Sequence, residues 1–479
     1  MINTFIHTSE NNNLYLYNHQ LRLSMLMHPE FKKVWEKSET EDSFYLKKYN
    51  YLKKHGFFSN SKPTKFANID ESAVKDLISQ TPQIVFETTD FCNLDCLYCS
   101  FGEFYEGYDE RHQKNINTIH AITLLEYIFS LKPKDKNNIL SIGFYGGEPL
   151  CNGAFVKKIV EVISQLKSEK EITVEYNMTT NATLIHRYID FLVENKFELL
   201  ISLDGNENNH SYRVFKKNKK NSFKKVINNI DMIHRDYPEY FNRYVNFNAV
   251  LHDKNSVKEI FEFIYTRYHK VPRIAELASD DMNLDNVSVY NKLFHNKGES
   301  EAKFLVDNPN VLPHDETIVY SELIDFVKYY SINFYVSNII DLLFGDKKYV
   351  PTNTCLPFWK KIMLTTTNKL MPCEKINYLK YSFGEVRNGK VIFDISEITS
   401  RYNFYYDHIK RNCESCYANK FCGVCLFLMD NMDKLGTTDF ICKNFHDQQA
   451  FSNKLNYIFS LLERYPNDFY QITENVTIE

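Results

Sequence analysis

Residues 84–100 read IVFETTDFCNLDCLYCS, and this stretch decides the fold because an apolar run leads directly into three closely spaced cysteines. The run at residues 84–88 is short and apolar, which predicts a β-strand. Cys92, Cys96 and Cys99 follow in the pattern C-x3-C-x2-C. The sequence therefore predicts a loop of three thiol ligands directly after a strand.

Three thiols at this spacing suit an iron–sulfur cluster. A cubane contains four irons, so three thiolates leave one iron open to chelate a small molecule that carries an amine and a carboxylate. The methionyl end of S-adenosylmethionine (SAM) carries both groups, and Tyr98 stands where its ring could pack on the adenine. The alternative is a structural zinc knuckle, but zinc usually takes four ligands, and no fourth one lies nearby in the sequence.

Polar residues and glycines also follow three further predicted strands, at residues 139–145, 172–179 and 198–203. Amphipathic helices are expected between the strands, for example at residues 119–129 and 155–166. Repeated strand–helix units imply a parallel sheet or barrel, in which ligands bind at the carboxyl ends of the strands. The residues at these ends are Gly146, Gly147, Glu148, Thr180, Asn181, Ser202 and Asp204, followed by His210 and Arg213. Each alone could belong to a turn or a helix cap, but their order behind the cysteines indicates one ligand site.

These motifs resemble the radical SAM superfamily, and within it the branch with C-terminal SPASM domains. They are CNLDCLYC at residues 92–99, YGGEP at 145–149, TTNATL at 179–184 and ISLDG at 201–205. The resemblance covers roughly residues 80–275. It implies an α/β fold with a partial (β/α)6 barrel, a 4Fe–4S cluster held by Cys92, Cys96 and Cys99, and production of a 5′-deoxyadenosyl radical from SAM.

The same resemblance implies roles for the residues at the strand ends. Gly146, Gly147 and Glu148 would meet the SAM amine. Asn181, Ser202 and Asp204 would lie near its ribose and carboxylate. Arg213 is expected to reach the carboxylate, although it stands one residue closer to His210 than in relatives.

A second group of cysteines near the C-terminus predicts further metal sites. Its members are Cys355, Cys373, Cys413, Cys416, Cys422, Cys425 and Cys442. On spacing alone, iron–sulfur clusters and zinc ribbons both remain open. Cys151 has no close partner in the sequence and is expected to be an ordinary core or loop residue.

The order of these cysteines resembles the SPASM domain, which implies two auxiliary 4Fe–4S clusters. Cys413, Cys416, Cys422 and Cys442 would hold one cluster, and Cys355, Cys373 and Cys425 the other. The chain departs from the family pattern at two points. Asn368 replaces a usual glycine in a hairpin expected at residues 361–371, where asparagine still tolerates a positive φ. Two residues separate Cys422 from Cys425 where three are usual.

The composition limits the class of protein. A chain of 479 residues with 43% hydrophobic side chains can bury a large core, and its length suggests about three domains. The net charge of −4 gives no reason to expect nucleic acid as a partner. No apolar stretch approaches 18 residues and the first 20 residues are polar, so neither a membrane span nor a secretory signal is expected. We therefore expect a cytoplasmic protein, in which clustered cysteines bind metal more often than they form disulfides.

The N-terminal part is expected to be a separate small α+β module. Strands are expected at residues 14–17 and 21–27, and a helix at 44–55 closed by Gly56. The module is either a cap on the barrel or a peptide-recognition domain that adds an extended leader peptide to a strand edge. The expected division is the module at 1–80, the barrel at 81–275, a bridging region at 276–350, the SPASM domain at 351–448, and a C-terminal helix and tail at 449–479.

This arrangement resembles maturases of ribosomally made peptides. It implies hydrogen abstraction from a precursor peptide with a leader sequence, a thioether or carbon–carbon crosslink or a related modification, and a flavodoxin- or ferredoxin-type reductant. The runner-up function is oxidation of a single residue in a protein, as in anaerobic sulfatase maturases, which usually lack the N-terminal module. A third hypothesis is a non-catalytic zinc or iron–sulfur scaffold. The sequence nominates no acid or base that would complete a reaction.

Overall fold

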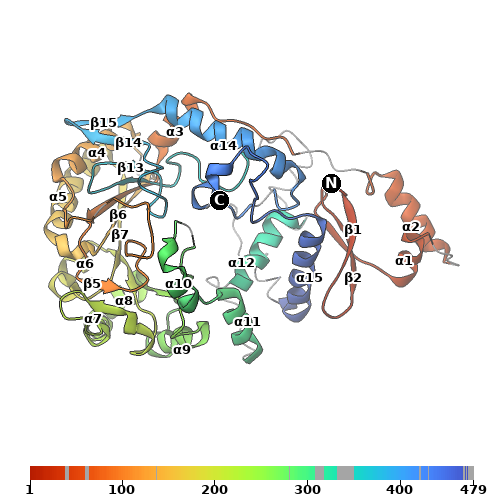
Figure 1. Cartoon of the computed structure of the whole chain (residues 1–479), viewed down its shortest axis with the longest axis horizontal. Helices are drawn as coiled ribbons and strands as arrows, with labels where there is room; N and C mark the ends of the chain where they lie inside the picture. The colour runs from red at the N-terminus through yellow and green to blue at the C-terminus, as the bar shows by residue number, and fades with distance from the viewer. Residues whose placement is uncertain are drawn as a thin grey trace.

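A computed structural model gives the arrangement of the chain (Figure 1). A broad sheet covered by helices lies at one end and a small three-stranded sheet at the other, with the C-terminal cysteine domain along the top of the view. The residues described are 1–37, 42–59, 64–109, 111–135, 137–279, 281–307, 318–331, 350–419, 422–429, 431–467, 470 and 472.

Within this described part, the largest sheet has eight strands in the order β11-β10-β8-β7-β6-β4-β12-β13. All neighbours pair in parallel except β12 and β13, which form an antiparallel hairpin. The bounds are β4 (Gln83–Thr89), β6 (Ile139–Gly146), β7 (Thr173–Thr180), β8 (Glu198–Ser202), β10 (Val245–Val250), β11 (Arg273–Ala275), β12 (Ile362–Leu364) and β13 (Leu370–Met371). The strands predicted near residues 84, 139, 172 and 198 are confirmed, as is the parallel barrel-like sheet.

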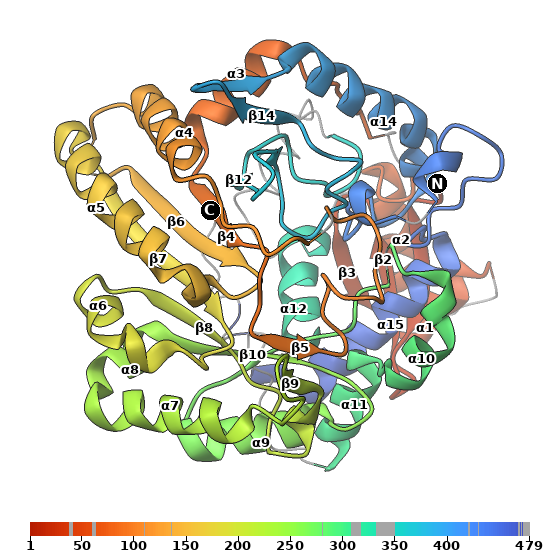
Figure 2. The same cartoon turned by 60° about the vertical axis from the view of Figure 1, so that its left-hand side comes forward.

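Helices cover the outer face of this sheet (Figure 2). They are α4 (Thr118–Leu131), α5 (Gly153–Lys170), α6 (Ile189–Glu194), α7 (Phe223–Asp236), α8 (Pro238–Tyr244) and α9 (Val257–Tyr268). In α4, Leu124, Leu125 and Ile128 recur at helical spacing and are fully buried. Burying each such side chain stabilises the fold by about 1.5–3 kcal/mol. The helices predicted at residues 119–129 and 155–166 are therefore confirmed.

The C-terminal cysteine domain is joined to the barrel through the hairpin of β12 and β13. Asn368 in its turn has a φ of 66°, so the predicted left-handed turn without glycine is confirmed. The domain continues with β14 (Gly384–Arg387), β15 (Lys390–Phe393) and the long helix α14 (Ile395–Ser415), which ends among the cysteines. Helix α3 (Glu71–Gln80) packs on α14, and the Ile69 N–H just before α3 donates to Asn403 of α14 at 2.9 Å.

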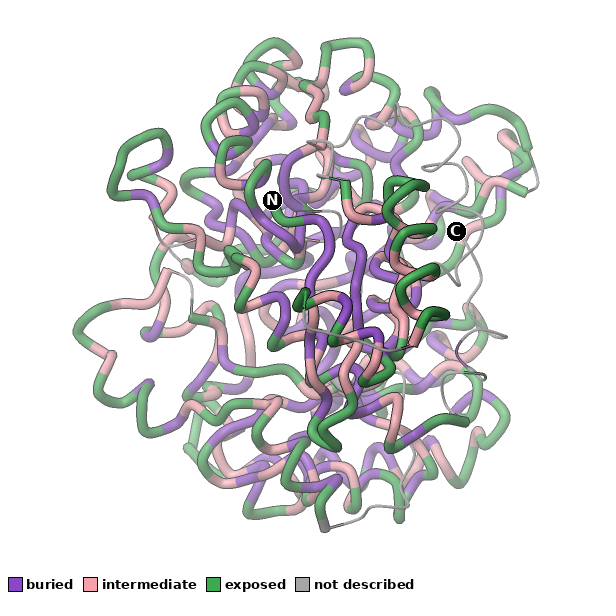
Figure 3. Tube along the Cα trace, turned by 90° about the vertical axis from the view of Figure 1, so that its right-hand side faces the viewer, coloured by how far each residue is buried: buried purple, intermediate pink, exposed green. Residues whose placement is uncertain are grey.

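The N-terminal module is an antiparallel sheet with two helices. It contains β1 (Thr4–Thr8), β2 (Leu14–Asn18), β3 (Leu23–Leu26), α1 (Pro29–Trp35) and α2 (Ser43–Lys54). The two predicted strands and the helix are confirmed, whereas β1 and α1 were not foreseen. Helix α15 (Gln448–Arg464) lies against β1, where Asn456 accepts a hydrogen bond from the Thr8 N–H at 2.8 Å. Three of the five residues in β1 and three of the five in β2 are buried (Figure 3).

The bridging region contains α10 (Val287–Leu293), α11 (Lys297–Asp307) and α12 (Ile318–Asp325). Residues 280, 308–317 and 332–349 of that predicted region lie outside the described residues. None of the helices in the part that is described is both long and apolar enough to cross a membrane.

Candidate functional site

A cavity of about 320 Å³ lies at the carboxyl ends of the barrel strands, where parallel sheets bind their ligands. Most of the residues predicted to contact SAM line this cavity. They are Tyr98, Gly146, Gly147, Glu148, Asn181, Ser202 and Arg213, together with Cys92, Cys96 and Cys99. The structure therefore brings three thiols and the strand-end motifs into one site.

The three thiols of the first loop share this cavity. Burial raises the pKa of Cys92 and Cys96, and charge repulsion among the thiols, including Cys99, raises it further. A strong positive charge beside Cys92 and Cys96 would favour their thiolates, and the irons of a cluster would supply it. No three His, Cys, Asp or Glu side chains of the described residues converge on one metal ion. A cubane does not need such convergence because its thiolates bind separate irons, so the donor set fits a cluster.

Gly146 and Gly147 hold the turn after β6 close against the cysteine loop. Gly146 has a φ of 122°, which disfavours any side chain there. A Cβ on Gly147 would overlap the carbonyl oxygen of Phe91, and the Gly147 N–H donates to the Thr89 carbonyl at 2.8 Å. The glycines are therefore needed for loop packing as well as for the predicted approach of a ligand.

Glu148 ties the turns after β6 and β7 together. Its carboxylate is almost fully buried and accepts from Thr180 Oγ1 at 2.8 Å and from the Asn181 N–H at 2.7 Å. Burial raises the pKa of Glu148 to about 7, and these hydrogen bonds oppose the rise. The Asn181 amide in turn donates to Asn93 Oδ1 at 2.9 Å, beside Cys92. Glu148 thus orients Asn181 at the cysteine loop.

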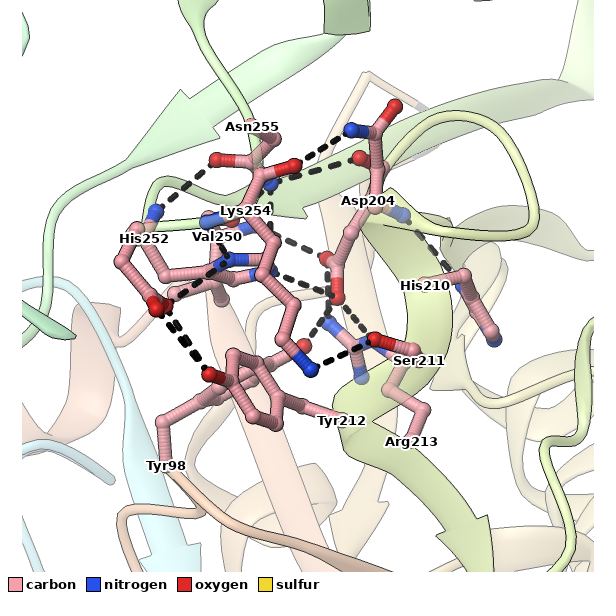
Figure 4. Close-up of polar contacts among 12 residues, drawn as sticks. Tyr98, Asp204, His210, Ser211, Tyr212, Arg213, Val250, His252, Lys254 and Asn255 are labelled. Carbon is pink, nitrogen blue, oxygen red and sulfur yellow. Dashed lines mark hydrogen bonds and ion pairs between the residues drawn. The ribbon is translucent and has the colours of Figure 1, made fainter.

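Asp204 is not among the residues that line the cavity, and its side chain is surrounded by polar groups of the protein (Figure 4). It is fully buried, and Arg213 binds it through two hydrogen bonds, Nε to Oδ2 at 2.8 Å and Nη2 to Oδ1 at 2.9 Å. The Val250 N–H donates to Oδ1 at 3.0 Å and the Tyr98 hydroxyl donates to Oδ2. Burial opposes ionisation, but Arg213 outweighs it and holds the pKa of Asp204 at about 2. The carboxylate predicted near the SAM ribose is thus engaged by protein donors.

Tyr98 is held from several sides. Its ring stacks on His252 with centroids 5.4 Å apart, and the Arg213 guanidinium lies 5.3 Å from its centroid. Tyr98 also lines the cavity, so packing of the ring on adenine stays a prediction.

Sequence reasoning did not nominate His252, Asn255, Arg111 or Lys216. His252 and Asn255 follow β10, and Asn255 Nδ2 donates to the Val250 carbonyl at 3.0 Å. The alternating run at residues 245–250 followed by polar residues is the same strand-end signal that identified the other motifs. Arg111 and Lys216 line the cavity but lie in loops outside any recognised motif.

The C-terminal cysteines fall into two neighbourhoods. Cys413 interacts electrostatically with Cys416, Cys422 and Cys442, and burial raises its pKa. Cys373 interacts in the same way with Cys425, while Tyr402 lies close to both Cys425 and Cys355. The cysteines are thus grouped in the same way as the two ligand sets that the SPASM resemblance implied, and the binding of clusters by these sets stays a prediction.

Comparisons with known proteins agree with this geometry. Residues 86–264 match the model of the Radical SAM superfamily. The radical SAM cyclopropyl synthase TigE of Paramaledivibacter caminithermalis is 28% identical over 167 residues, 33% of either chain. The cysteine-type anaerobic sulfatase-maturating enzyme of Clostridium novyi is 32% identical over 151 residues, 31% of this chain and 39% of that enzyme. The matched stretch thus spans less than half the length of either relative.

The fold extends further than the sequence similarity. The solved structure of histidine-tagged anSMEcpe with bound AdoMet superposes with a TM-score of 0.52 at 16% identity. It covers 83% of this chain and 100% of that one, so the similarity of fold reaches beyond the barrel.

Proposed function

We propose that this chain, in which residues 86–264 match the model of the Radical SAM superfamily, abstracts hydrogen from a ribosomally made precursor peptide and installs a thioether or carbon–carbon crosslink. The observation that carries the proposal is the cavity in which three thiols meet the glycine turn and the strand-end motifs. When bound there, a 4Fe–4S cluster and SAM supply a 5′-deoxyadenosyl radical.

The protein's own residues hold and orient these groups. Cys92, Cys96 and Cys99 bind three irons of the cluster. The turn of Gly146 and Gly147 receives the SAM amine, and Asn181 and Ser202 lie on the side of the ribose and carboxylate.

The N-terminal module holds the leader of the precursor peptide. Its β1 edge is covered by α15, whereas no strand of the described residues pairs with the outer edge of β3. Leu26 at the end of β3 is 62% exposed. Such an edge accepts an extended peptide as an additional strand, with main-chain hydrogen bonds giving affinity.

The C-terminal domain binds two auxiliary 4Fe–4S clusters. Cys413, Cys416, Cys422 and Cys442 hold one, and Cys355, Cys373 and Cys425 hold the other with a position left for another ligand. When bound there, these clusters would offer a site for the substrate or an acceptor for one electron. A cytoplasmic flavodoxin- or ferredoxin-type protein supplies the reducing electron.

A second candidate function is oxidation of one residue in a protein substrate. It is favoured by the 32% identity to the sulfatase-maturating enzyme of Clostridium novyi. The three-stranded N-terminal module, with its open β3 edge, favours the peptide crosslinking function instead. A non-catalytic zinc or iron–sulfur scaffold, the third hypothesis, predicts no SAM cleavage under reducing conditions.

The test is the intact mass of a small peptide encoded beside this gene, co-expressed anaerobically with the enzyme. The matched control is the Cys92/Cys96/Cys99→Ala variant. Loss of two hydrogens per crosslink, dependent on the three cysteines, supports crosslinking, and fragmentation then locates the bond. An unchanged mass with accumulation of 5′-deoxyadenosine would reject the peptide and leave the single-residue oxidation to be tested on a sulfatase.

A further inference from the structure

Asp204 and Arg213 form a buried ion pair beside Tyr98 of the first cysteine loop (Figure 4). Asp204 is 0% exposed and Arg213 is 7% exposed. The two hydrogen bonds between them, with donors from Tyr98 and Val250, engage both oxygens of the carboxylate. Arg213 therefore cannot swing away without leaving a buried carboxylate short of partners, which is strongly unfavourable.

Backbone pairing fixes the other side of Arg213. The short strands β5 (Leu94–Cys96) and β9 (Arg213–Phe215) form an antiparallel ladder in which Cys96 is the partner of Arg213. Partner side chains of such a ladder lie on the same face, with Cβ atoms about 4.5–5.5 Å apart, and both residues line the same cavity. The guanidinium is thus bound to the Asp204 carboxylate and lies beside the Cys96 side chain, and its fork of five N–H donors leaves further donors for the sulfur.

We propose that Arg213 and Asp204 set the reduction potential of the cluster held by Cys92, Cys96 and Cys99, with Asp204 as the positioning residue that aims Arg213 at the Cys96 sulfur. The inference rests on the proposed function only in requiring a cluster at these three cysteines.

The direction of each contribution follows from charge. Reduction adds one negative charge to the cluster, so a cation that donates to a ligand sulfur favours the reduced form. Asp204 supplies the opposite charge and limits this effect while it holds the guanidinium in place. The guanidinium is bound to Asp204 and lies beside Cys96. It is therefore not available to bind the SAM carboxylate alone.

Two single variants should move the potential in opposite directions. Arg213→Gln removes the cation and should lower the ratio of reduced to oxidised cluster at a fixed potential about tenfold, equal to 59 mV for a one-electron couple. Asp204→Asn keeps an acceptor for Arg213 but removes the negative charge, and should raise the potential. The double variant carries neither charge and should lie close to the wild type.

The readout is a redox titration of the purified, cluster-loaded enzyme without SAM, followed by electron paramagnetic resonance. The Cys92/Cys96/Cys99→Ala variant, titrated in parallel, gives the signal of any auxiliary clusters for subtraction. Arg267→Gln is the matched control, because Arg267 also binds a carboxylate, Asp231, through two nitrogens but lies on the outer helices. If Arg213→Gln does not fold, Arg213→Lys keeps the charge with one nitrogen and should give a smaller shift of the same sign.

Shifts of the same sign in both single variants, or shifts no larger than that of Arg267→Gln, would overturn the inference. The titration needs no peptide, so its result is independent of whether the precursor peptide is modified. A failure of the three cysteines to bind any cluster would instead refute the proposed function itself.

Discussion

Replacing His7 with phenylalanine should make the docking of the N-terminal module insensitive to pH. His7 lies in β1 with 3% exposure, stacked on Tyr15 at 5.4 Å and edge-on to Phe459 of α15 at 4.7 Å. Neither ring nitrogen has a hydrogen-bond partner of good geometry among the described residues. The Asn456 side chain is near enough to the ring to raise the pKa of His7 in part. Phenylalanine keeps the ring contacts and removes the titratable group.

The expected magnitude follows from the pKa of His7. Burial lowers it from 6.5 to about 4, and Asn456 opposes the shift in part. When the module detaches from α15 the imidazole regains water and its ordinary pKa, so the detached state binds the proton more tightly. Docking therefore weakens as the pH falls below about 6.5, and the loss levels off below about 4. At 1.36 kcal/mol per pKa unit the full loss is about 3 kcal/mol, and at pH 5 it is about 2 kcal/mol.

Hydrogen exchange followed by mass spectrometry measures this docking directly. Peptides from β1 and α15 of the wild type should lose protection between pH 6.5 and 5, after correction for the intrinsic pH dependence of exchange. The His7→Phe protein should keep its protection over this range. The matched control is His55→Phe, which changes an exposed histidine of the same module. Equal loss of protection in wild type and His7→Phe would refute the reasoning.

Three further outcomes are expected. Gly147→Ala should lower the iron content bound by the first cysteine loop, because its Cβ overlaps that loop; Gly423→Ala, where a Cβ meets open space, should not. Arg111→Met should destabilise the protein by about 3–5 kcal/mol, since it leaves the Glu87 carboxylate, 4% exposed and 3.2 Å from Arg111, without its cation. Thermal unfolding measures this loss, and adding Glu87→Gln should recover much of it. Leu26→Asp should weaken binding of the precursor peptide about tenfold by fluorescence anisotropy, for a loss of about 1.5 kcal/mol of apolar contact; unchanged affinity would move the recognition edge away from β3.

Local patterns in the sequence identified much of the barrel. Apolar runs gave the positions of β4, β6, β7 and β8, and helical spacing gave α4 and α5. The sequence pattern did not predict β1 or α1, because short strands and helices contain few periodic positions. Strand β10 was also not predicted, although apolar residues alternate with polar ones over residues 245–250, which is a strand pattern.

The spacing of the cysteines also predicted which three thiols share the cavity at the strand ends. C-x3-C-x2-C is a local pattern, and three thiols within eight residues must lie near one another in any fold. The position of a residue behind a strand did not reveal which groups its side chain contacts. Asp204 follows a strand as predicted, yet its carboxylate faces Arg213, Tyr98 and the Val250 N–H instead of the cavity.

The sequence by itself therefore determined the resemblance to a superfamily over the barrel, the thiol loop and the parallel sheet, since each depends on residues close together in the chain. Tertiary structure alone decided that β12 extends the barrel sheet beside β4, that α15 covers β1, and that Arg213 joins Asp204 to Cys96. These contacts join segments up to about 450 residues apart, as in the Thr8–Asn456 hydrogen bond. The partner of a given buried charge or strand edge depends on how the whole chain packs, because many partners are compatible with the same local pattern.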